Sequence, residues 1–439
     1  MLDINLFRVD KGGNPDIIKN SQIARGGDPT LVDQVIEKDN QWRNINHQKT
    51  QINEKINLLQ KQITANRIAA RNKNEIPDVT NLEEEKRECE KEQTELNQLA
   101  QTIQEERDLI LTKIGNIVDD TVPVHTDEKY NRIEKVWGNN RNPDNLYHHY
   151  DLLQMIDGCD MERGTKVAGH RGYFLKGNGL LLSMALQRYA VDFLMKRNFM
   201  PIAPPLFMNQ DIMGECAQLT QFKDELYHVT GEGFEEQNNK YLIATSEQPL
   251  CALHRGETLD PNVLPLRYCG VSNCFRKEAG AHGKDVRGIF RVHQFEKVEQ
   301  FVIADPEKSK EIHQELLQNA EEFLQTLELP YQVVCIVTGE LNLAVAKKWD
   351  IEAWFPAPNH QHYRELVSCS NCTDYQARRL NIRCGHGQKK YVHMLNSTLC
   401  AVTRVICCIL ENHQTPDGII IPPVLRPYMN NRCLIPFKQ

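Results

Sequence analysis

The sequence predicts an α+β protein in which a long antiparallel two-helix coiled-coil arm precedes a domain with a mainly antiparallel sheet flanked by helices. Two observations predict the arm: apolar residues follow a 3,4 spacing over residues 35–63, and a second run does so over residues 82–117. A third observation predicts the sheet, because short β-rich runs beyond about residue 150 do not alternate strictly with helices.

The predicted arm consists of two polar-flanked apolar seams joined by the short segment ANRIAARNKNEIPDVT, in which Pro77 and several Asn favour a reversal. Helices joined in this way must run antiparallel, and at 1.5 Å per residue they reach roughly 50–60 Å. We expect the arm at about residues 30–117 within an N-terminal domain 1–118, followed by a linker and a second domain at 119–439. The first seam is Val35, Lys38, Trp42, Ile45, Lys49, Ile52, Ile56, Leu59 and Ile63, and the second is Leu82, Cys89, Leu96, Leu99, Ile103, Ile110 and Ile117.

Charge is unevenly distributed along this arm. Residues 38–73 carry eight Lys or Arg against two acidic residues, whereas residues 75–108 carry twelve Asp or Glu against four basic ones. One interpretation is that the two helices neutralise each other through interhelical ion pairs. The other is that the outgoing helix and the tip present a basic stripe to a polyanion. The sequence leaves both open.

Composition bounds the class of protein. Charged residues make up 25% and apolar residues 40% of 439 residues, and no apolar run approaches the length of a membrane span. The start MLDINLFRVDKGG has no apolar signal segment, so the fourteen cysteines are expected to be reduced thiols in the cytosol. The net charge of −7 argues weakly against a nucleic-acid partner, although a local basic patch matters more than the sum.

The stretch CFRKEAGAHGKDVRGIFRVHQFEKVEQF (274–301) predicts a strand, a polar glycine-containing loop and a returning strand. Such a hairpin suits a triphosphate: Arg276 can bind a phosphate bidentately, Lys284 and Arg287 can follow the leaving part, and Phe295 offers a stacking face. The alternative is an exposed hairpin with surface ion pairs, and spacing alone does not decide between the two.

This stretch resembles motif 2 of the class II aminoacyl-tRNA synthetases in the form found in seryl-tRNA synthetases. The segments LLLSMALQRYAVDFLMKRNFMPIAPPLF (180–207) and MLNSTLCAVTRVICCILENHQ (394–414) resemble motifs 1 and 3. The strings TSE (245–247) and YRELVSCSNCTDYQARR (363–379) are similar to further signatures of that family, and the N-terminal hairpin is similar to its tRNA-binding arm. The resemblance covers nearly the whole chain and implies a class II catalytic domain that ligates L-serine to tRNA with ATP.

The resemblance also implies residue roles at the nucleotide. Arg276 and Arg404 are the implied catalytic residues, at the α- and γ-phosphates respectively, and Glu365 with Ser368 is the implied Mg²⁺ pair. Cations are needed because negative charge accumulates on phosphate oxygens when the serine carboxylate attacks the α-phosphorus. The implied ATP-binding residues are Arg276, Glu278, Arg291, Val292, Phe295, Glu365, Ser368 and Arg404.

For the other substrates, the resemblance implies a serine pocket, a tRNA-binding arm and a homodimer formed through motif 1. Glu299 has an alternative interpretation as an ion-pair partner of Lys297 or Arg291. The implied RNA substrates are tRNA(Ser) and, where it is present, tRNA(Sec). The implied serine-binding residues are Thr245, Glu247, Glu299, Asn396 and Thr398, and the predicted tRNA-binding residues are Lys55, Lys61, Arg67 and Arg71.

Three other interpretations are less favoured, one of a metal site and two of the function. Cys369, Cys372, Cys384 and His386 have a spacing that suggests zinc, but the first two lie inside the signature that implies ATP and Mg²⁺ binding. A paralogue that loads another carrier is expected to lack the basic arm. An RNA-binding or structural coiled-coil protein with an inactive catalytic body is expected to have lost Arg276, Glu365 or Arg404.

Overall fold

The computed structural model describes residues 1–73, 76–142, 145–217, 225–230, 239–278, 287–358 and 362–438. The chain divides into two compact units, one of residues 2–23 and 27–115, the other of residue 1, residues 24–26 and residues 116–439. Within the described ranges, no helix combines the length and apolar character needed to cross a membrane. Lys284 and the loop glycines at 280 and 283 lie outside the described residues.

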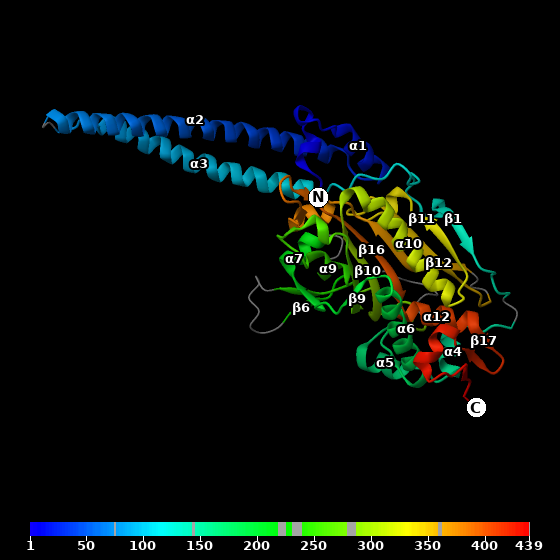
Figure 1. The fold of residues 1–439 in the computed structure, drawn as a ribbon. Coiled ribbons are helices and arrows are strands. Elements are labelled where there is room, and N and C mark those ends of the chain that lie inside the picture. The colour runs from blue at the N-terminus through cyan, green and yellow to red at the C-terminus, as the bar shows by residue number, and fades with distance from the viewer. Residues whose placement is uncertain are drawn as a thin grey trace. The chain divides into compact units, whose positions relative to one another are not determined.

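The smaller unit is dominated by two long helices, α2 (Thr30–Lys73) and α3 (Thr80–Leu111), which pack along each other (Figure 1). They run antiparallel, since Lys38 pairs with Glu106 near one end and Arg67 pairs with Glu83 near the other. This confirms the predicted arm. The buried apolar side chains at the helix–helix contact include Val35, Ile45, Leu59, Ile63, Cys89 and Ala100.

The second predicted seam is wrong at one position and too long at its end. Leu99 is 47% exposed, and the neighbouring Ala100 is buried in its place. Helix α3 ends at Leu111, so Ile117 lies beyond it and belongs to the larger unit. A strict heptad slips relative to a helix of 3.6 residues per turn, which moves the buried stripe by one residue over a long run.

The base of the arm is joined by a buried ionic cluster centred on Asp39. Arg8 approaches its carboxylate at 2.7 Å and Arg107 at 2.8 Å, and the Arg107 guanidinium also lies 5.3 Å from the Trp42 ring centroid. Burial alone raises the pKa of Asp39, but the hydrogen bonds and charges of the two arginines outweigh it and the pKa is lowered. The cluster ties residues 1–11 to both helices.

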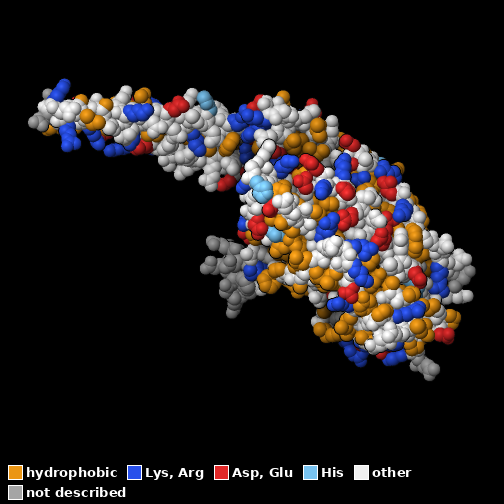
Figure 2. All heavy atoms as spheres, viewed as in Figure 1, with side chains coloured by type: hydrophobic (Ala, Val, Ile, Leu, Met, Phe, Trp, Pro, Cys, Tyr) orange, Lys and Arg blue, Asp and Glu red, His pale blue; other side chains and the backbone are white. Residues whose placement is uncertain are grey.

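Half of the eight basic residues of the outgoing helix are paired. Lys38, Lys55 and Arg67 each form an ion pair with a glutamate of α3, and Arg43 pairs with Asp10. Interhelical pairing therefore explains three of the eight. Among the described residues, no carboxylate lies within 4.0 Å of Lys49, Lys61, Arg71 or Lys73. Figure 2 shows Lys and Arg side chains gathering on the distal part of the arm.

The larger unit is built on an eight-stranded sheet with the order β1-β11-β12-β13-β16-β10-β9-β4. Every neighbouring pair is antiparallel except β4 with β9, which confirms the predicted mainly antiparallel sheet. The strands are β1 (Arg132–Trp137), β11 (Tyr331–Cys335), β12 (Lys347–Phe355), β13 (His362–Asn371), β16 (His393–Ala401), β10 (Gln294–Ala304), β9 (Leu266–Phe275) and β4 (Met200–Ile202).

Three helices form the main core with this sheet: α6 (Gly177–Met195), α10 (Ser309–Thr326) and α12 (Val402–His413) (Figure 1). Because side chains alternate along a strand, residues such as Val298, Leu395 and Ile351 enter this core, while their neighbours point to the opposite face. Polar residues therefore collect on that opposite face, over the central strands, where the candidate site lies.

Shorter elements complete the molecule. The remaining helices are α1 (Pro15–Ala24), α4 (His149–Met155), α5 (Met161–Ala168), α7 (Gln210–Cys216), α9 (Glu247–Ala252) and α11 (Tyr375–Leu380). The remaining strands are β2 (Cys159–Asp160), β3 (Phe174–Leu175), β5 (Phe207–Asn209), β6 (His228–Val229), β7 (Lys240–Leu242), β8 (Thr258–Leu259), β14 (Arg383–Cys384), β15 (Lys390–Tyr391), β17 (Gln414–Thr415), β18 (Gly418–Ile420) and β19 (Leu434–Pro436).

Candidate active site

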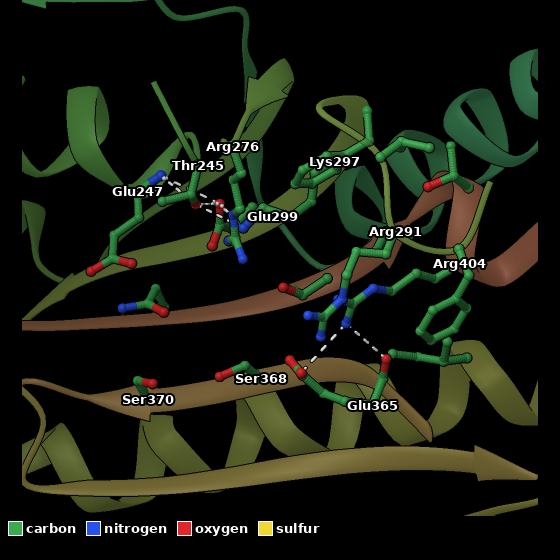
Figure 3. A pocket seen from close by; sticks show the side chains of 18 of the residues that line it. Thr245, Glu247, Arg276, Arg291, Lys297, Glu299, Glu365, Ser368, Ser370 and Arg404 are labelled. Atoms are coloured by element: carbon green, nitrogen blue, oxygen red, sulfur yellow. Dashed lines mark hydrogen bonds and ion pairs between the residues drawn. The ribbon is translucent and has the colours of Figure 1, made fainter. Parts of the chain in front are cut away.

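One cleft on the polar face of the sheet brings together every residue that the resemblance implies for ATP and serine (Figure 3). Its empty volume, including the open mouth, is about 990 Å³. The cleft is lined from β10, β12, β13 and β16, from the starts of α9 and α12, and by Arg276 directly after β9. The thirteen implied residues along it are Thr245, Glu247, Arg276, Glu278, Arg291, Val292, Phe295, Glu299, Glu365, Ser368, Asn396, Thr398 and Arg404.

Strand geometry explains these placements. Phe295, Lys297 and Glu299 recur at every second position of β10 and so point to the same face. Glu365 and Ser368 are three apart, which would place them on opposite faces of a regular strand. The register between β12 and β13 shifts, because Ile351 pairs with Val367 and Glu352 with Glu365. The bulge returns both Glu365 and Ser368 to the cleft.

At one end of the cleft, a polar cluster surrounds the buried carboxylate of Glu299. Its Oε2 accepts hydrogen bonds from Thr245 Oγ1 at 2.5 Å and Ser246 Oγ at 2.8 Å, and lies 3.1 Å from Lys297 Nζ. Burial alone raises the pKa of Glu299, but Lys297 and the hydroxyl donors outweigh it and the pKa is lowered. Directly across the ladder lies Thr398. Glu299 therefore both forms the ion pair with Lys297 and lines the cleft.

Glu247, at the start of α9, lies beside this cluster. Its Oε1 accepts a hydrogen bond of 2.9 Å from Gln376 on α11. Burial, together with the negative charge of Glu299, raises the pKa of Glu247 to about 7. The two adjacent carboxylates thus have opposite pKa shifts, raised for Glu247 and lowered for Glu299. An ammonium group bound between them would add positive charge there, so this end of the cleft suits such a group.

Three arginines also face the cleft, with Arg276 beside the Glu299 cluster and Arg291 and Arg404 toward the other end (Figure 3). Arg276 follows β9 and donates from Nε to the Ala244 carbonyl oxygen at 3.4 Å, and its guanidinium lies 5.6 Å from the Phe295 ring centroid. Arg404 donates to the Glu365 carbonyl oxygen at 3.0 Å. Arg291 lies 3.7 Å from the carboxylate of Glu278. Guanidinium groups held in this way suit phosphate oxygens, and Phe295 offers a ring face.

Sequence reasoning missed several residues that line the cleft. Lys297 was interpreted only as an ion-pair partner, although the period-2 signal of β10 could have placed it between Phe295 and Glu299. Phe290 also lines the cleft, and its ring lies 5.0 Å from the Arg404 guanidinium. Arg287 does not line the cleft, and its guanidinium lies 5.7 Å from the Tyr150 ring. Further unpredicted lining residues are Asn342, Lys348, Leu366, Ser370, Ala401 and Thr403.

The donor sets differ in what cation they suit. Glu365 and Ser368 offer carboxylate and hydroxyl oxygens, which a hard ion such as Mg²⁺ prefers. The cysteines considered for zinc do not converge, since Cys369 and Cys384 lie in different core clusters and His386 is exposed beside Asp260. Within the described part of the chain, no three His, Cys, Asp or Glu side chains group as metal ligands.

Comparison with known proteins agrees with this geometry. The seryl-tRNA synthetase N-terminal domain matches residues 1–118, and the tRNA synthetase class II core domain (G, H, P, S and T) matches residues 227–413. The chain is 50% identical to a serine–tRNA ligase of Helianthus annuus, with 100% of this chain and 99% of the relative covered. It is 49% identical to a cytoplasmic serine–tRNA ligase of Arabidopsis thaliana, with 100% and 97% covered.

Solved structures give the same result. A cytoplasmic serine–tRNA ligase from Naegleria fowleri in complex with AMP matches with a TM-score of 0.90 and 48% identity, covering 100% of this chain and 99% of that one. A seryl-tRNA synthetase from Pyrococcus horikoshii complexed with ATP matches with a TM-score of 0.90 and 39% identity, covering 100% of both. Identity of this level along the whole chain confirms the resemblance: the chain belongs to the seryl-tRNA synthetase family.

Proposed function

We propose that this chain is a cytoplasmic serine–tRNA ligase that converts L-serine and ATP to seryl-adenylate and pyrophosphate. It then transfers serine to the 3′-terminal adenosine of tRNA(Ser), and of tRNA(Sec) where that tRNA is present. The observation that carries the proposal is one cleft in which a carboxylate–hydroxyl cluster adjoins three arginines. ATP–pyrophosphate exchange with each of the twenty amino acids tests it, and exchange driven best by an amino acid other than serine contradicts it.

At the nucleotide end, Arg276 is proposed to bind the α-phosphate and Arg404 the γ-phosphate. Phe295 stacks on adenine beside Val292, Glu278 holds the adenine amino group or orients the loop, and Arg291 neutralises substrate charge. These side chains position and stabilise charge, so no side-chain nucleophile is needed. The serine carboxylate attacks the α-phosphorus, and pyrophosphate leaves.

Mg²⁺ is proposed to bind at Glu365 and Ser368. Their carboxylate and hydroxyl oxygens both line the cleft and are the kind of ligand that this ion prefers. When bound, the ion supplies charge neutralisation across the phosphates. Arg404, which contacts Glu365, brings a second positive charge to the same place.

At the serine end, Thr245, Glu247 and Glu299 are proposed to surround the amino group and hydroxyl, with Asn396 and Thr398 as further contacts. Glu299 is 2% exposed, and Asn396 and Thr398 are also buried. Water is therefore largely excluded around these groups, which strengthens each hydrogen bond that the substrate makes and penalises each one that it fails to make.

The serine KM is expected to rise about tenfold when the pH falls from 8 to 6. The pKa of Glu247 in the empty cleft is raised to about 7, so its carboxylate is protonated as the pH falls through that value, while the amino group of serine stays positively charged. Steady-state exchange kinetics at several pH values measure it. Glu247→Gln should bind serine weakly at every pH and remove the dependence. A KM that stays flat in the unsubstituted enzyme would rule out this role for Glu247.

The N-terminal domain, proposed as residues 1–118, is expected to bind the tRNA through the basic residues of the arm. Recognition of RNA shape relies mainly on phosphate and sugar contacts, which suit long flexible cations along a helical hairpin. Of the four predicted residues, Lys55 and Arg67 are paired with glutamates, whereas Lys61 and Arg71 have no acidic partner among the described residues. This difference allows a matched test.

Replacing Lys61 and Arg71 together with Ala is expected to weaken tRNA binding and to flatten its dependence on log salt by roughly 0.7–0.9 per lost phosphate contact. Filter binding or fluorescence titration over a salt series measures the slope. Lys55→Ala with Arg67→Ala is the matched control, and should change the slope less because those cations already have partners. An unchanged slope in the first pair would mean that the arm's charges serve only to hold its two helices together.

A homodimer is proposed to form through α6 and the edge strand β4. Leu180, Leu181 and Met184 on α6 and Met200 on β4 are 41–60% exposed, which leaves apolar area at the sheet edge. Met184→Glu with Met200→Glu is expected to halve the molar mass measured by light scattering. Val263→Glu, an apolar-to-acidic change at a residue that is 49% exposed elsewhere, is the control and should leave the mass unchanged. A double variant that keeps the dimer mass places the interface elsewhere.

A further inference from the structure

Asp350 is a buried carboxylate that the roles proposed above do not use. It lies on β12 with 6% of its surface exposed, and its Oδ2 is 3.3 Å from Lys348 Nζ. Its Oδ1 is buried and has no donor in hydrogen-bonding geometry among the residues that the structure describes. Burial raises the pKa of Asp350, and the charge of Lys348 and the nearby Ser368 hydroxyl act against that rise. A buried acceptor without a donor is unfavourable, so a hydroxyl close to it is expected to turn its proton toward it when the cleft is filled.

The sheet register shows which residue faces this atom. Asp350 pairs directly with Ser368 across the β12–β13 ladder, so both side chains point to the same face. The flanking pairs are Lys348 with Ser370, and Glu352 with Glu365. Lys348, Ser368, Ser370 and Glu365 line the cleft, so the side chain of Asp350 lies on the cleft face of the sheet, beside Ser368.

The other carboxylates on this patch already have partners. Glu365 lies 3.4 Å from Arg404 Nη1, and Glu352 accepts a hydrogen bond of 2.7 Å from Gln332. Asp350 shares only one of its two oxygens, with Lys348. The unpaired oxygen is therefore specific to the position opposite Ser368 and not a general property of an acidic surface.

The chemistry of a hydroxyl ligand supplies the missing donor. A neutral serine hydroxyl binds a cation through an oxygen lone pair, so its proton must point away from the ion to an acceptor. Groups that orient metal ligands in this way commonly change metal affinity by about 10–100-fold. The carboxylate opposite Ser368 is placed to be that acceptor.

We propose that Asp350 is a positioning residue that accepts the hydroxyl proton of Ser368 and thereby turns a Ser368 lone pair toward Mg²⁺ at the triphosphate. The inference rests on the proposed binding of Mg²⁺ by Glu365 and Ser368. It assigns Asp350 no contact with the substrates or the ion. Its effect is transmitted through Ser368 alone, which distinguishes it from a general electrostatic effect of a nearby negative charge.

The test measures how much Mg²⁺ strengthens ATP binding, as the ratio of the affinities for Mg²⁺–ATP and for ATP in excess chelator, by calorimetry on the full chain. Asp350→Asn is expected to lower the ratio about tenfold. In this variant the ammonium group of Lys348, which can only donate hydrogen bonds, attracts the oxygen of the new amide. The NH₂ group of that amide then faces Ser368, and because it is also a donor it cannot accept the hydroxyl proton. Ser368→Ala should give a similar loss, and the double variant should lose no more than Ser368→Ala alone.

Glu352→Gln is the matched control, because it removes one negative charge from the same face of the same strand. Its ratio should stay within about twofold of the unsubstituted chain. An unchanged ratio in Asp350→Asn, a further loss in the Ser368→Ala background, or an equal loss in Glu352→Gln overturns the inference. If Glu365→Gln and Ser368→Ala both leave the ratio unchanged, the proposed Mg²⁺ site itself fails, and the role of Asp350 fails with it.

A crystal structure of the unsubstituted chain with Mg²⁺ and a non-hydrolysable ATP analogue provides a test that does not depend on the variants folding. The Ser368 Oγ to Asp350 Oδ1 distance is expected at about 2.5–3.0 Å. A Ser368 hydroxyl directed to another acceptor in that complex overturns the inference.

Discussion

Arg276→Ala is expected to lower ATP–pyrophosphate exchange with serine by about two to three orders of magnitude. Removing one fixed charge-assisted donor from a developing oxyanion costs on the order of 3 kcal/mol of transition-state stabilisation. The Arg276 backbone N–H donates to the His293 carbonyl oxygen, which fixes the backbone at this position, and its Nε donates to the Ala244 carbonyl oxygen at 3.4 Å. The guanidinium therefore already faces the cleft before substrate binds.

Arg267→Ala is the control for this experiment. Arg267 lies on β9, the strand that Arg276 directly follows, but it pairs with Glu315 at 2.9 Å and does not line the cleft. Exchange in that variant should remain within a few-fold of the unsubstituted enzyme, and tRNA binding should be intact in both variants. If Arg276→Ala also stays within a few-fold, the assignment of its guanidinium to the α-phosphate is wrong.

The arm could be predicted well from sequence because a 3,4 seam is a local signal. The seam did not predict which polar residues of the arm are buried or paired, because this depends on contacts with residues far apart in the sequence. Asp39 lies between two seam positions and is nevertheless buried, since Arg8 and Arg107 neutralise it from segments far apart in the chain. The seam also does not predict which basic residues form ion pairs, because this depends on the residues of the facing helix. Arg67 pairs with Glu83, whereas Lys61 has no acidic partner among the described residues.

The site was predictable through motif resemblance far more than through periodicity. Spacing left the hairpin at 274–301 undecided between a triphosphate site and surface ion pairs, and the motifs resolved it. The bulge that brings Glu365 and Ser368 to one face is invisible to a period-2 reading, since it depends on the partner strand. Asp350 belongs to none of these motifs, and only the register places it opposite Ser368.

Alanine is expected to be activated at least about 10⁴-fold less efficiently than serine. A pocket that hydrogen-bonds a hydroxyl is left with buried unpaired groups when that hydroxyl is missing, whereas an apolar pocket distinguishes such small differences poorly. Glu299 is 2% and Thr398 7% exposed, and they lie opposite each other in the β10–β16 ladder. Water cannot readily replace the missing hydroxyl between them.

Comparison of kcat/KM for serine and alanine in pyrophosphate exchange measures this discrimination. Thr398→Val keeps the shape of the side chain and removes its hydroxyl, so it should lower the serine value and leave the alanine value nearly unchanged, which narrows the ratio. Glu299 already binds Thr245 and Ser246 through Oε2, so its Oε1 is the atom expected to meet the substrate hydroxyl. Threonine carries that hydroxyl and must be rejected by its extra methyl group, which contributes only about 1–3 kcal/mol. If alanine is activated only about tenfold less well than serine, the pocket selects by size, and the hydroxyl is not what Glu299 and Thr398 recognise.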